Sequence, residues 1–219
     1  MDHDSKDIAN RILENLDECH ESYYGTQVFS GPSLYFHQRV LEYRNKNTER
    51  CIEYLYAMLT SWGMHRMGPK GAKMKRFTTF RDAIIKTLPE INKLTNCSFE
   101  DFSDWDIAHR IFIDINIMQT KPILVSNSKI LSHLLPNLFA PIDREYTLKY
   151  AHRNMPSSHL KQFALFKDIH IHLYYPITCS HQFKIRLVKW SDPKKYPWNT
   201  SPLKIVDNLI IGAKKVLSY

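Results

Sequence analysis

The sequence feature that most constrains the fold of this chain is residues 123–150, ILVSNSKILSHLLPNLFAPIDREYTLKY. Proline cannot continue a helix, so Pro136 and Pro141 predict a loop that separates two helices. The apolar residues before this loop recur at helical spacing and predict one buried face, formed by Ile130, Leu131, Leu134 and Leu135. The stretch therefore predicts a short buried helix, a proline-bounded loop and a second helix.

Polar residues at the ends of these elements extend the prediction. Ser126 or Asn127 is expected to cap the first helix and Asp143 the second, because short polar side chains accept hydrogen bonds from free backbone N–H groups. A helix of about seven residues is only about 10 Å long. A loop that doubles back along so short a helix would return Asp143 towards Lys129.

The segment LVSNSKIL, followed by PID and a new helix, resembles the core of the helix-hairpin-helix DNA glycosylase superfamily, in a divergent and poorly characterised branch. Members of that superfamily carry a Gly-x-Gly hairpin, a lysine at the start of the next helix and a proline-hydrophobic-aspartate signature. The resemblance implies that Lys129 matches the nucleophilic lysine of bifunctional members and Asp143 their catalytic aspartate. Val125 and Asn127 stand where the hairpin glycines would be.

Composition places the chain among ordinary globular proteins. Its 219 residues are 43% hydrophobic and 24% charged, which suffices for a core in one domain or one bilobal domain. There is no apolar run of membrane-spanning length, and the N-terminus is acidic, so we expect neither a membrane span nor a secretory signal. The cysteines are scattered without a CxxC pair, which indicates a reducing compartment: the cytoplasm, associated with the nucleoid, or the nucleus.

The net charge of +8 is unevenly distributed along the chain. Residues 1–21 are rich in acids. Residues 62–81 contain glycines and no Asp or Glu, and their basic residues are Arg66, Lys70, Lys73, Lys75, Arg76 and Arg81. A basic patch is the expected footprint of a surface that binds a polyanion, and a solvated linker is the plain alternative. Because glycine lets a backbone approach a ligand closely, we favour a DNA-facing loop.

Helical periodicity recurs along the rest of the chain. The pattern predicts an all-α fold with minor strand content, in which two helix groups flank the central hairpin. Residues 173–200 are expected to be irregular, and the alternation in residues 183–190, FKIRLVKW, fits a strand or an amphipathic turn. The expected helices are residues 4–24, 33–43, 48–62, 80–94, 104–118, 157–172 and 203–217, the last opened by Ser201 and Pro202.

Two patterns have the outline of metal sites, but neither is persuasive. Asp82, Glu90 and Lys93 form a D…ExK arrangement, yet that nuclease site needs strands and this stretch is helical. His170 and His172 are only two alternate histidines, and we expect them to be structural or solvent-facing. We therefore expect no metal and no cofactor.

The resemblance implies a DNA glycosylase, which hydrolyses the N-glycosidic bond of a damaged or modified base flipped out of double-stranded DNA. Asp143 would stabilise the oxocarbenium-like sugar or orient water. Lys129 would form a Schiff base with the sugar if the enzyme also cleaves the strand. The alternatives are a non-catalytic nucleic-acid-binding helical module, and a nuclease or defence component.

The same reading assigns further residues to the DNA interface, and we expect the protein to act as a monomer. The candidates for a base pocket or a wedge are the aromatic residues Trp62, Tyr56 and Tyr146. The expected DNA contacts are Arg66, Lys70, Lys73, Lys75 and Arg76 of the basic loop, together with Asn127 and Arg144.

Overall fold

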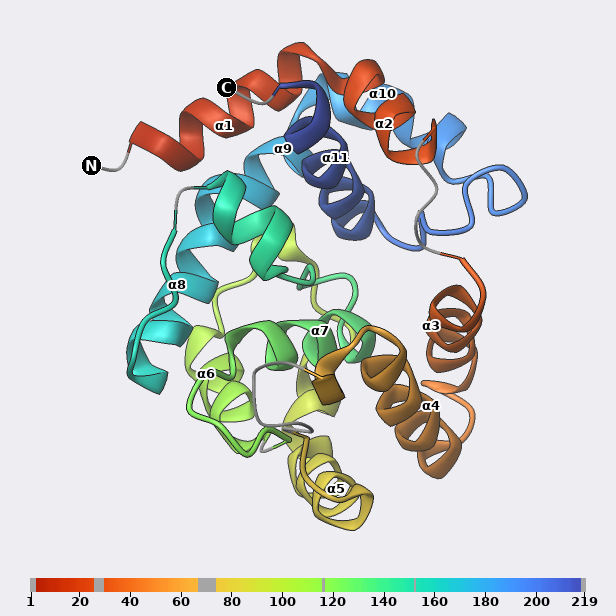
Figure 1. Ribbon diagram of the computed structural model, residues 1–219, viewed down its shortest axis with the longest axis vertical. Coiled ribbons are helices and arrows are strands. Elements are labelled where there is room, and N and C mark those ends of the chain that lie inside the picture. The colour runs from red at the N-terminus through yellow and green to blue at the C-terminus, as the bar shows by residue number, and fades with distance from the viewer. Residues whose placement is uncertain (1–2, 26–29, 67–73, 116, 152, 218–219) are drawn as a thin grey trace.

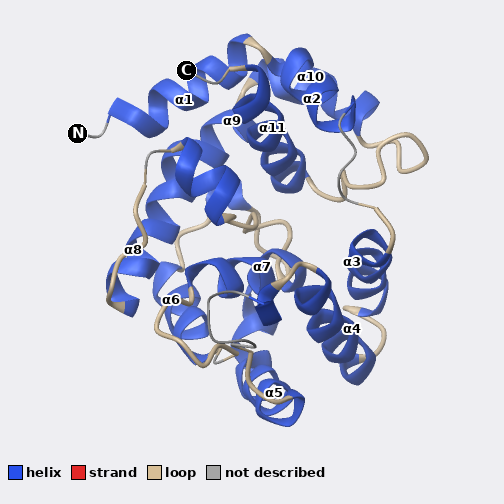
Figure 2. Ribbon diagram, in the orientation of Figure 1, coloured by secondary structure: helices blue, strands red, loops and turns tan. Residues whose placement is uncertain are grey.

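The computed structural model describes residues 3–25, 30–66, 74–115, 117–151 and 153–217, which form helices joined by loops (Figures 1 and 2). Within these described ranges the one β-type pairing is an isolated antiparallel bridge between Met74 and Met118. The predicted all-α fold is therefore confirmed. None of the described helices is long and apolar enough to cross a membrane.

The first half of the chain forms helices close to the expected ranges. The expected helix at residues 4–24 is divided at Asn15 into two. The elements are α1 (His3–Glu14), α2 (Leu16–Gly25), α3 (Pro32–Tyr43), α4 (Thr48–Ser61), the 3-10 turn η1 (Met64–Arg66), α5 (Phe77–Leu94), the 3-10 turn η2 (Phe99–Asp101) and α6 (Trp105–Asp114).

The second half begins with the central stretch and ends on a long apolar helix. Its elements are α7 (Leu124–Leu134), the π-helical turn η3 (Arg144–Leu148), α8 (His159–Ile169), the π-helical turn η4 (His170–Tyr174), α9 (Tyr175–Cys179), α10 (His181–Trp190) and α11 (Pro202–Val216). The expected start of α11 is confirmed, because Ser201 accepts a hydrogen bond from the N–H of Lys204, and Ser158 caps α8 in the same way by accepting one from Lys161.

The prediction for residues 173–200 was wrong, since much of this segment is helical. Phe183 and Trp190 lie seven residues apart, which places both on the buried face of α10, whereas Ile185 and Val188 are exposed. Apolar residues on two faces of one helix produced the alternation that resembled a strand. The Ser180 side chain caps α10 by accepting a hydrogen bond from the N–H of Phe183.

Figure 1 shows α1, α2, α9, α10 and α11 gathered at one end of the molecule and α3 to α7 at the other. A contiguous hydrophobic cluster contains residues from both groups, including Ile12, Leu55, Leu131 and Leu209. The Arg11 guanidinium of α1 donates a hydrogen bond of 2.8 Å to the Leu217 carbonyl oxygen and so ties α1 to the end of α11.

Helices α2 and α11 approach each other with almost no space between their backbones. A Cβ atom added to Gly212 of α11 would lie 1.9 Å from the carbonyl oxygen of Cys19 in α2. Any side chain at this position would force the helices apart. This contact fixes α11 against α2 and so places two walls of the cavity described below.

The start of α7 differs from the prediction. The helix begins at Leu124, so Ser126 and Asn127 lie inside it and neither caps it. The cap comes from α8, where the Gln162 side-chain oxygen accepts hydrogen bonds of 2.8 and 3.0 Å from the N–H groups of Ile123 and Leu124. The segment that the resemblance matched to a hairpin is therefore helical.

Asn127 is buried, and the prediction that it contacts DNA was wrong. Its side-chain amide donates hydrogen bonds of 2.7 and 2.9 Å to the carbonyl oxygens of Phe112 and Ile115. These carbonyls lie at the C-terminal end of α6, where an α-helix leaves acceptors without intrahelical partners. Asn127 thus ties α7 to α6, and the N–H groups of its side-chain amide are already used within the protein.

Candidate active site

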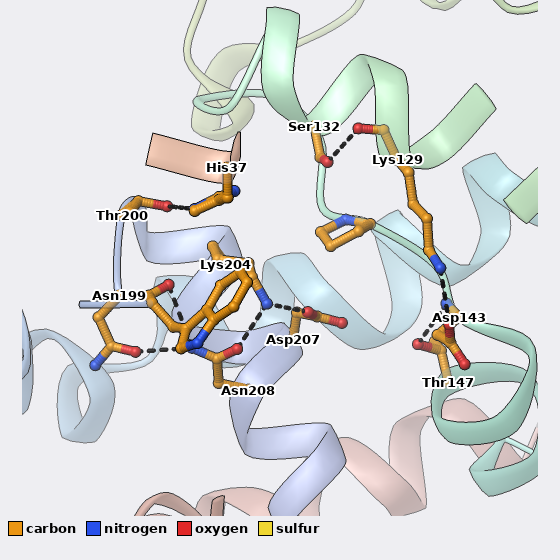
Figure 3. Close-up of polar contacts among 12 residues, drawn as sticks. His37, Lys129, Ser132, Asp143, Thr147, Asn199, Thr200, Lys204, Asp207 and Asn208 are labelled. Atoms are coloured by element: carbon orange, nitrogen blue, oxygen red, sulfur yellow. Dashed lines mark hydrogen bonds and ion pairs between the residues drawn. The ribbon is translucent and has the colours of Figure 1, made fainter. Parts of the chain in front are cut away.

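An ion pair joins the two residues that the sequence singled out. Lys129 Nζ and Asp143 Oδ2 form an ion pair (Figure 3), with 2.9 Å between the two atoms. The lysine side chain is 8% exposed. The loop between α7 and η3 doubles back as predicted, and the Ser128 hydroxyl holds it by accepting a hydrogen bond of 3.0 Å from the N–H of Ile142. Lys129 comes from the second turn of α7 rather than from its first residues.

Asp143 is held by a dense set of donors. Its Oδ1 atom caps η3 by accepting hydrogen bonds from the N–H groups of Glu145 and Tyr146, which confirms the predicted cap. Burial alone would raise the pKa of Asp143. The charge and the hydrogen bond of Lys129, together with the two backbone N–H groups, outweigh burial and lower that pKa below its ordinary value. Asp143 is therefore an ionised carboxylate at neutral pH.

A second lysine–carboxylate pair lies on α11. Lys204 Nζ is 2.6 Å from Asp207 Oδ2 and 2.7 Å from the Asn208 side-chain oxygen (Figure 3). Asn208 is held in turn by Asn199, whose side-chain oxygen accepts a hydrogen bond of 2.8 Å from it. Burial raises the pKa of Asp207, and the neighbouring charge of Lys204 opposes that shift without cancelling it.

Sequence reasoning missed this second pair, although a signal was present. The last helix reads PLKIVDNLIIGA, in which Lys204, Asp207 and Asn208 interrupt an otherwise apolar run. Charged residues in a helix that is apolar on all sides are buried, and buried charges need partners. That rule indicates a polar cluster on α11 without showing what it faces.

Both lysine–aspartate pairs line one cavity of about 320 Å³, which we call the aromatic cavity. Its aromatic walls are Tyr23, Trp62, Tyr146 and Trp198. The ammonium groups lie against the indole rings, Lys129 Nζ 5.2 Å from the centre of Trp62 and Lys204 Nζ 5.4 Å from that of Trp198. The cavity thus combines flat apolar walls with two polar corners.

A neighbouring cleft of about 590 Å³ shares Trp62, Lys129 and Asp143 with the aromatic cavity. It extends past Arg144 and Lys121, both of which are exposed. The Lys129–Asp143 pair therefore lies in the wall common to both spaces, with aromatic rings on one side and cationic side chains on the other.

The structure brings some of the predicted aromatic residues together and leaves one out. Trp62 and Tyr146 line the aromatic cavity, as a base pocket requires. Tyr56 does not: its ring packs against Phe77 and Phe80, and its hydroxyl donates a hydrogen bond of 2.8 Å to the Lys75 carbonyl oxygen. We therefore remove Tyr56 from the candidate site.

The basic loop is described in part. Lys70, Lys73 and the side chain of Arg66 lie outside the described residues. Lys75 is half-buried, and its N–H donates a hydrogen bond of 2.7 Å to the Ile117 carbonyl oxygen. Arg76 is exposed just before α5. Met118, which pairs with Met74 beside these residues, lines the neighbouring cleft, so the end of the loop lies next to that cleft.

Two buried histidines lie behind the site in one chain of hydrogen bonds. The Lys129 carbonyl oxygen can only accept, so His133 Nδ1 donates to it at 2.7 Å. His133 Nε2 then accepts from His37 Nδ1 at 2.8 Å, and His37 Nε2 accepts from the Thr200 hydroxyl at 3.0 Å. Burial lowers the pKa of His133 to about 4 and that of His37 well below its ordinary value. Both rings are neutral at neutral pH.

We expect these histidines to make the protein acid-sensitive. Burial also lowers the pKa values of His20 and His170 to about 4. Between pH 6.5 and 4 such a histidine binds a proton in the unfolded chain but not in the folded one. The free energy of unfolding should therefore fall as the pH falls, by up to about 1.4 kcal/mol per pH unit for each buried histidine.

Urea unfolding between pH 7.5 and 4.5 measures this slope. His133→Gln should reduce it, because one buried titrating group is lost. His172→Gln serves as the matched control, since that ring is 42% exposed, and it should leave the slope unchanged. A free energy of unfolding that stays flat from pH 7 to 5 would contradict the expectation.

The two metal-like patterns have other partners. Asp82 pairs with Arg81 on α5, and Glu90 of the same helix pairs with Arg110. His170 Nε2 accepts a hydrogen bond of 2.9 Å from the N–H of Ala140. Within the described part of the chain, no group of three or more His, Cys, Asp or Glu residues is arranged to hold a metal ion.

Comparisons with protein-family models, with curated protein sequences and with solved structures find no match to this chain.

Proposed function

We propose that this protein removes a base from double-stranded DNA by hydrolysing the N-glycosidic bond. The observation that carries the proposal is the position of the Lys129–Asp143 pair, in the wall between the aromatic cavity and the neighbouring cleft. An enzyme of this class needs three features side by side: a pocket for the flipped base, a carboxylate beside the sugar, and a positively charged surface for the strand.

The aromatic cavity has the chemistry of a base pocket. A flipped base is flat and loses its stacking partners, so it gains from aromatic faces. Trp62 and Trp198 offer such faces, and Tyr146 lies at the same cavity beside Asp143. A volume of about 320 Å³ falls at the small end of the range for ligand pockets, which suits one base rather than a whole nucleotide.

Asp143 fits the role of the carboxylate that faces the sugar. The transition state of N-glycosidic hydrolysis carries positive charge on the sugar ring, which an ionised carboxylate stabilises. The lowered pKa of Asp143 keeps it ionised. Its side chain is 29% exposed, so it is accessible from the cavities that it lines.

Lys129 fits a supporting role better than that of a nucleophile. Only an amine that is free to approach the sugar carbon can attack it, and the Lys129 side chain is held 2.9 Å from Asp143 in an ion pair. The reaction proposed here therefore uses water, with Lys129 orienting Asp143. Arg144 and Lys121 line the neighbouring cleft, and in this proposal their cationic side chains hold the flanking phosphates.

The test is release of a free base. The protein is incubated with duplex oligonucleotides that each carry one modified base, and mass spectrometry detects the released base and the abasic strand. We expect base release without added metal and without a covalent adduct that borohydride traps. Binding to every duplex with release from none would favour a non-catalytic nucleic-acid-binding module, and metal-dependent strand cleavage would favour a nuclease.

A further inference from the structure

The aromatic cavity contains a second carboxyl group that the proposed reaction does not yet use. Asp207 and Lys204 line this cavity on α11, whereas Asp143 and Lys129 line it from η3 and α7. Asp207 is almost fully buried, yet it borders the space that the base would occupy. Figure 3 shows the two pairs on separate elements, with the Lys204 ammonium between Asp207 and Asn208.

We propose that Asp207 is the general acid that protonates the departing base, and that Lys204 stabilises the carboxylate left behind. This inference rests on the proposed base excision. A base that leaves with the electron pair of the broken bond carries negative charge, which is costly in a cavity with apolar walls. A proton delivered at that moment removes the cost, and such assistance is typically worth a factor of about 10²–10⁴ in rate.

For a neutral base, cleavage of the glycosidic bond is coupled to the transfer of one proton. The C1′–N bond breaks and its electron pair goes to the base nitrogen, while the Asp207 carboxyl transfers its proton to an acceptor atom of the base. Water then attacks C1′, and its proton goes to the Asp143 carboxylate and on to solvent. Asp207 regains a proton from solvent when the free base leaves. The net change is addition of one water across the glycosidic bond.

The surroundings of the two carboxyl groups favour a protonated Asp207 and an ionised Asp143. Charged and titratable groups from several elements face Asp207: Lys204 of its own helix, Tyr23 of α2, Tyr174 of η4, and Asp143 and Lys129 from the opposite wall. Burial and the negative charge of Asp143 favour the protonated form of Asp207, while Asp143 itself stays ionised. Two carboxyl groups whose pKa values are pushed in opposite directions are the usual arrangement of an acid and a stabilising anion.

The experiment uses two leaving groups in otherwise identical duplexes. 7-Methylguanine already carries a positive charge and leaves as a neutral base, whereas hypoxanthine needs a proton to do so. We expect Asp207→Asn to slow single-turnover release of hypoxanthine by about 100-fold or more, and to change release of 7-methylguanine by less than about threefold. Asp168→Asn is the control, because Asp168 pairs with Arg153 outside the aromatic cavity and should affect neither substrate.

A measurement without substrate keeps the inference testable if neither probe is cleaved. Carboxyl ¹³C NMR of the aspartate-labelled protein follows the titration of each aspartate, and the Asp207 signal is the one that is lost in Asp207→Asn. We expect Asp207 to titrate with a pKa above the ordinary aspartate value of about 3.9. A pKa of Asp207 at or below the ordinary aspartate value overturns the inference. An equal loss of release rate for hypoxanthine and 7-methylguanine in Asp207→Asn also overturns it. If Asp143→Asn keeps full activity on a cleaved probe, base excision at this site fails instead.

Discussion

Asp143→Asn should lower base release by about 10²–10⁴-fold, because the carboxylate that stabilises the charged sugar is lost while the shape of the side chain is kept. Asparagine caps a helix as well as aspartate does, so η3 should keep its N-terminal hydrogen bonds. The measurement is the single-turnover rate on a duplex whose base the wild-type protein releases. Unchanged activity in this variant would reduce Asp143 to a helix cap.

The Asp143 variant should also cost stability, which needs its own control. Lys129 is 8% exposed, and the substitution removes its counter-charge. A buried lysine without its partner costs on the order of 1–3 kcal/mol, more than loss of a cap would. Adding Lys129→Met removes the stranded charge and should recover most of the free energy of unfolding without recovering activity. Activity that returned together with stability would show that the pair is architectural.

Gly212→Ala should be among the most destabilising single-methyl additions in this chain. The new Cβ would lie 1.9 Å from the Cys19 carbonyl oxygen and 3.2 Å from the backbone nitrogen of Tyr23. Backbone atoms of a helix cannot turn aside as a side chain can, so α2 and α11 must separate. We expect a loss of about 3 kcal/mol in the free energy of unfolding, at the upper end for an overpacked core.

Urea unfolding of Gly212→Ala and Gly25→Ala measures this effect with a matched control. A Cβ atom at Gly25 would meet nothing within 4 Å, and the backbone there has no positive φ, so Gly25→Ala should be close to neutral. The backbone of Tyr23 lies at this contact, and its side chain lines the aromatic cavity. Gly212→Ala should therefore also lower base release by the fraction of the protein that folds. Equal stability of the two variants would contradict the close approach of the helices.

The parts of the site that could be predicted from the sequence are those set by local geometry. Lys129 and Asp143 are joined by a short helix and a loop bounded by prolines, so their meeting follows from chain length alone. Lys204 and Asp207 could not be placed in the same way. What they face depends on how α11 packs against α2 and η3, and no local pattern encodes that packing.

The errors at the start of α7 have a common physical cause, which is competition from distant partners. Ser126 and Asn127 are good capping residues, but Gln162 reaches the start of α7 from another helix and takes that role. Asn127 is then free to satisfy the end of α6. In residues 183–190 the exposed Ile185 and Val188 imitate a strand, because exposure itself cannot be read from residue type.

The Gln162 cap also affects how a nucleic-acid backbone would be held. Free N–H groups at the start of a helix bind phosphate by hydrogen bonds and the helix dipole, and they need no charged side chain. In α7 the N–H groups of Ile123 and Leu124 already have an acceptor within the protein. A phosphate in the neighbouring cleft would then depend mainly on the charged side chains of Arg144 and Lys121, whose attraction for DNA weakens steeply with ionic strength. The binding of a DNA strand in this cleft would therefore be more sensitive to salt than binding by main-chain N–H groups.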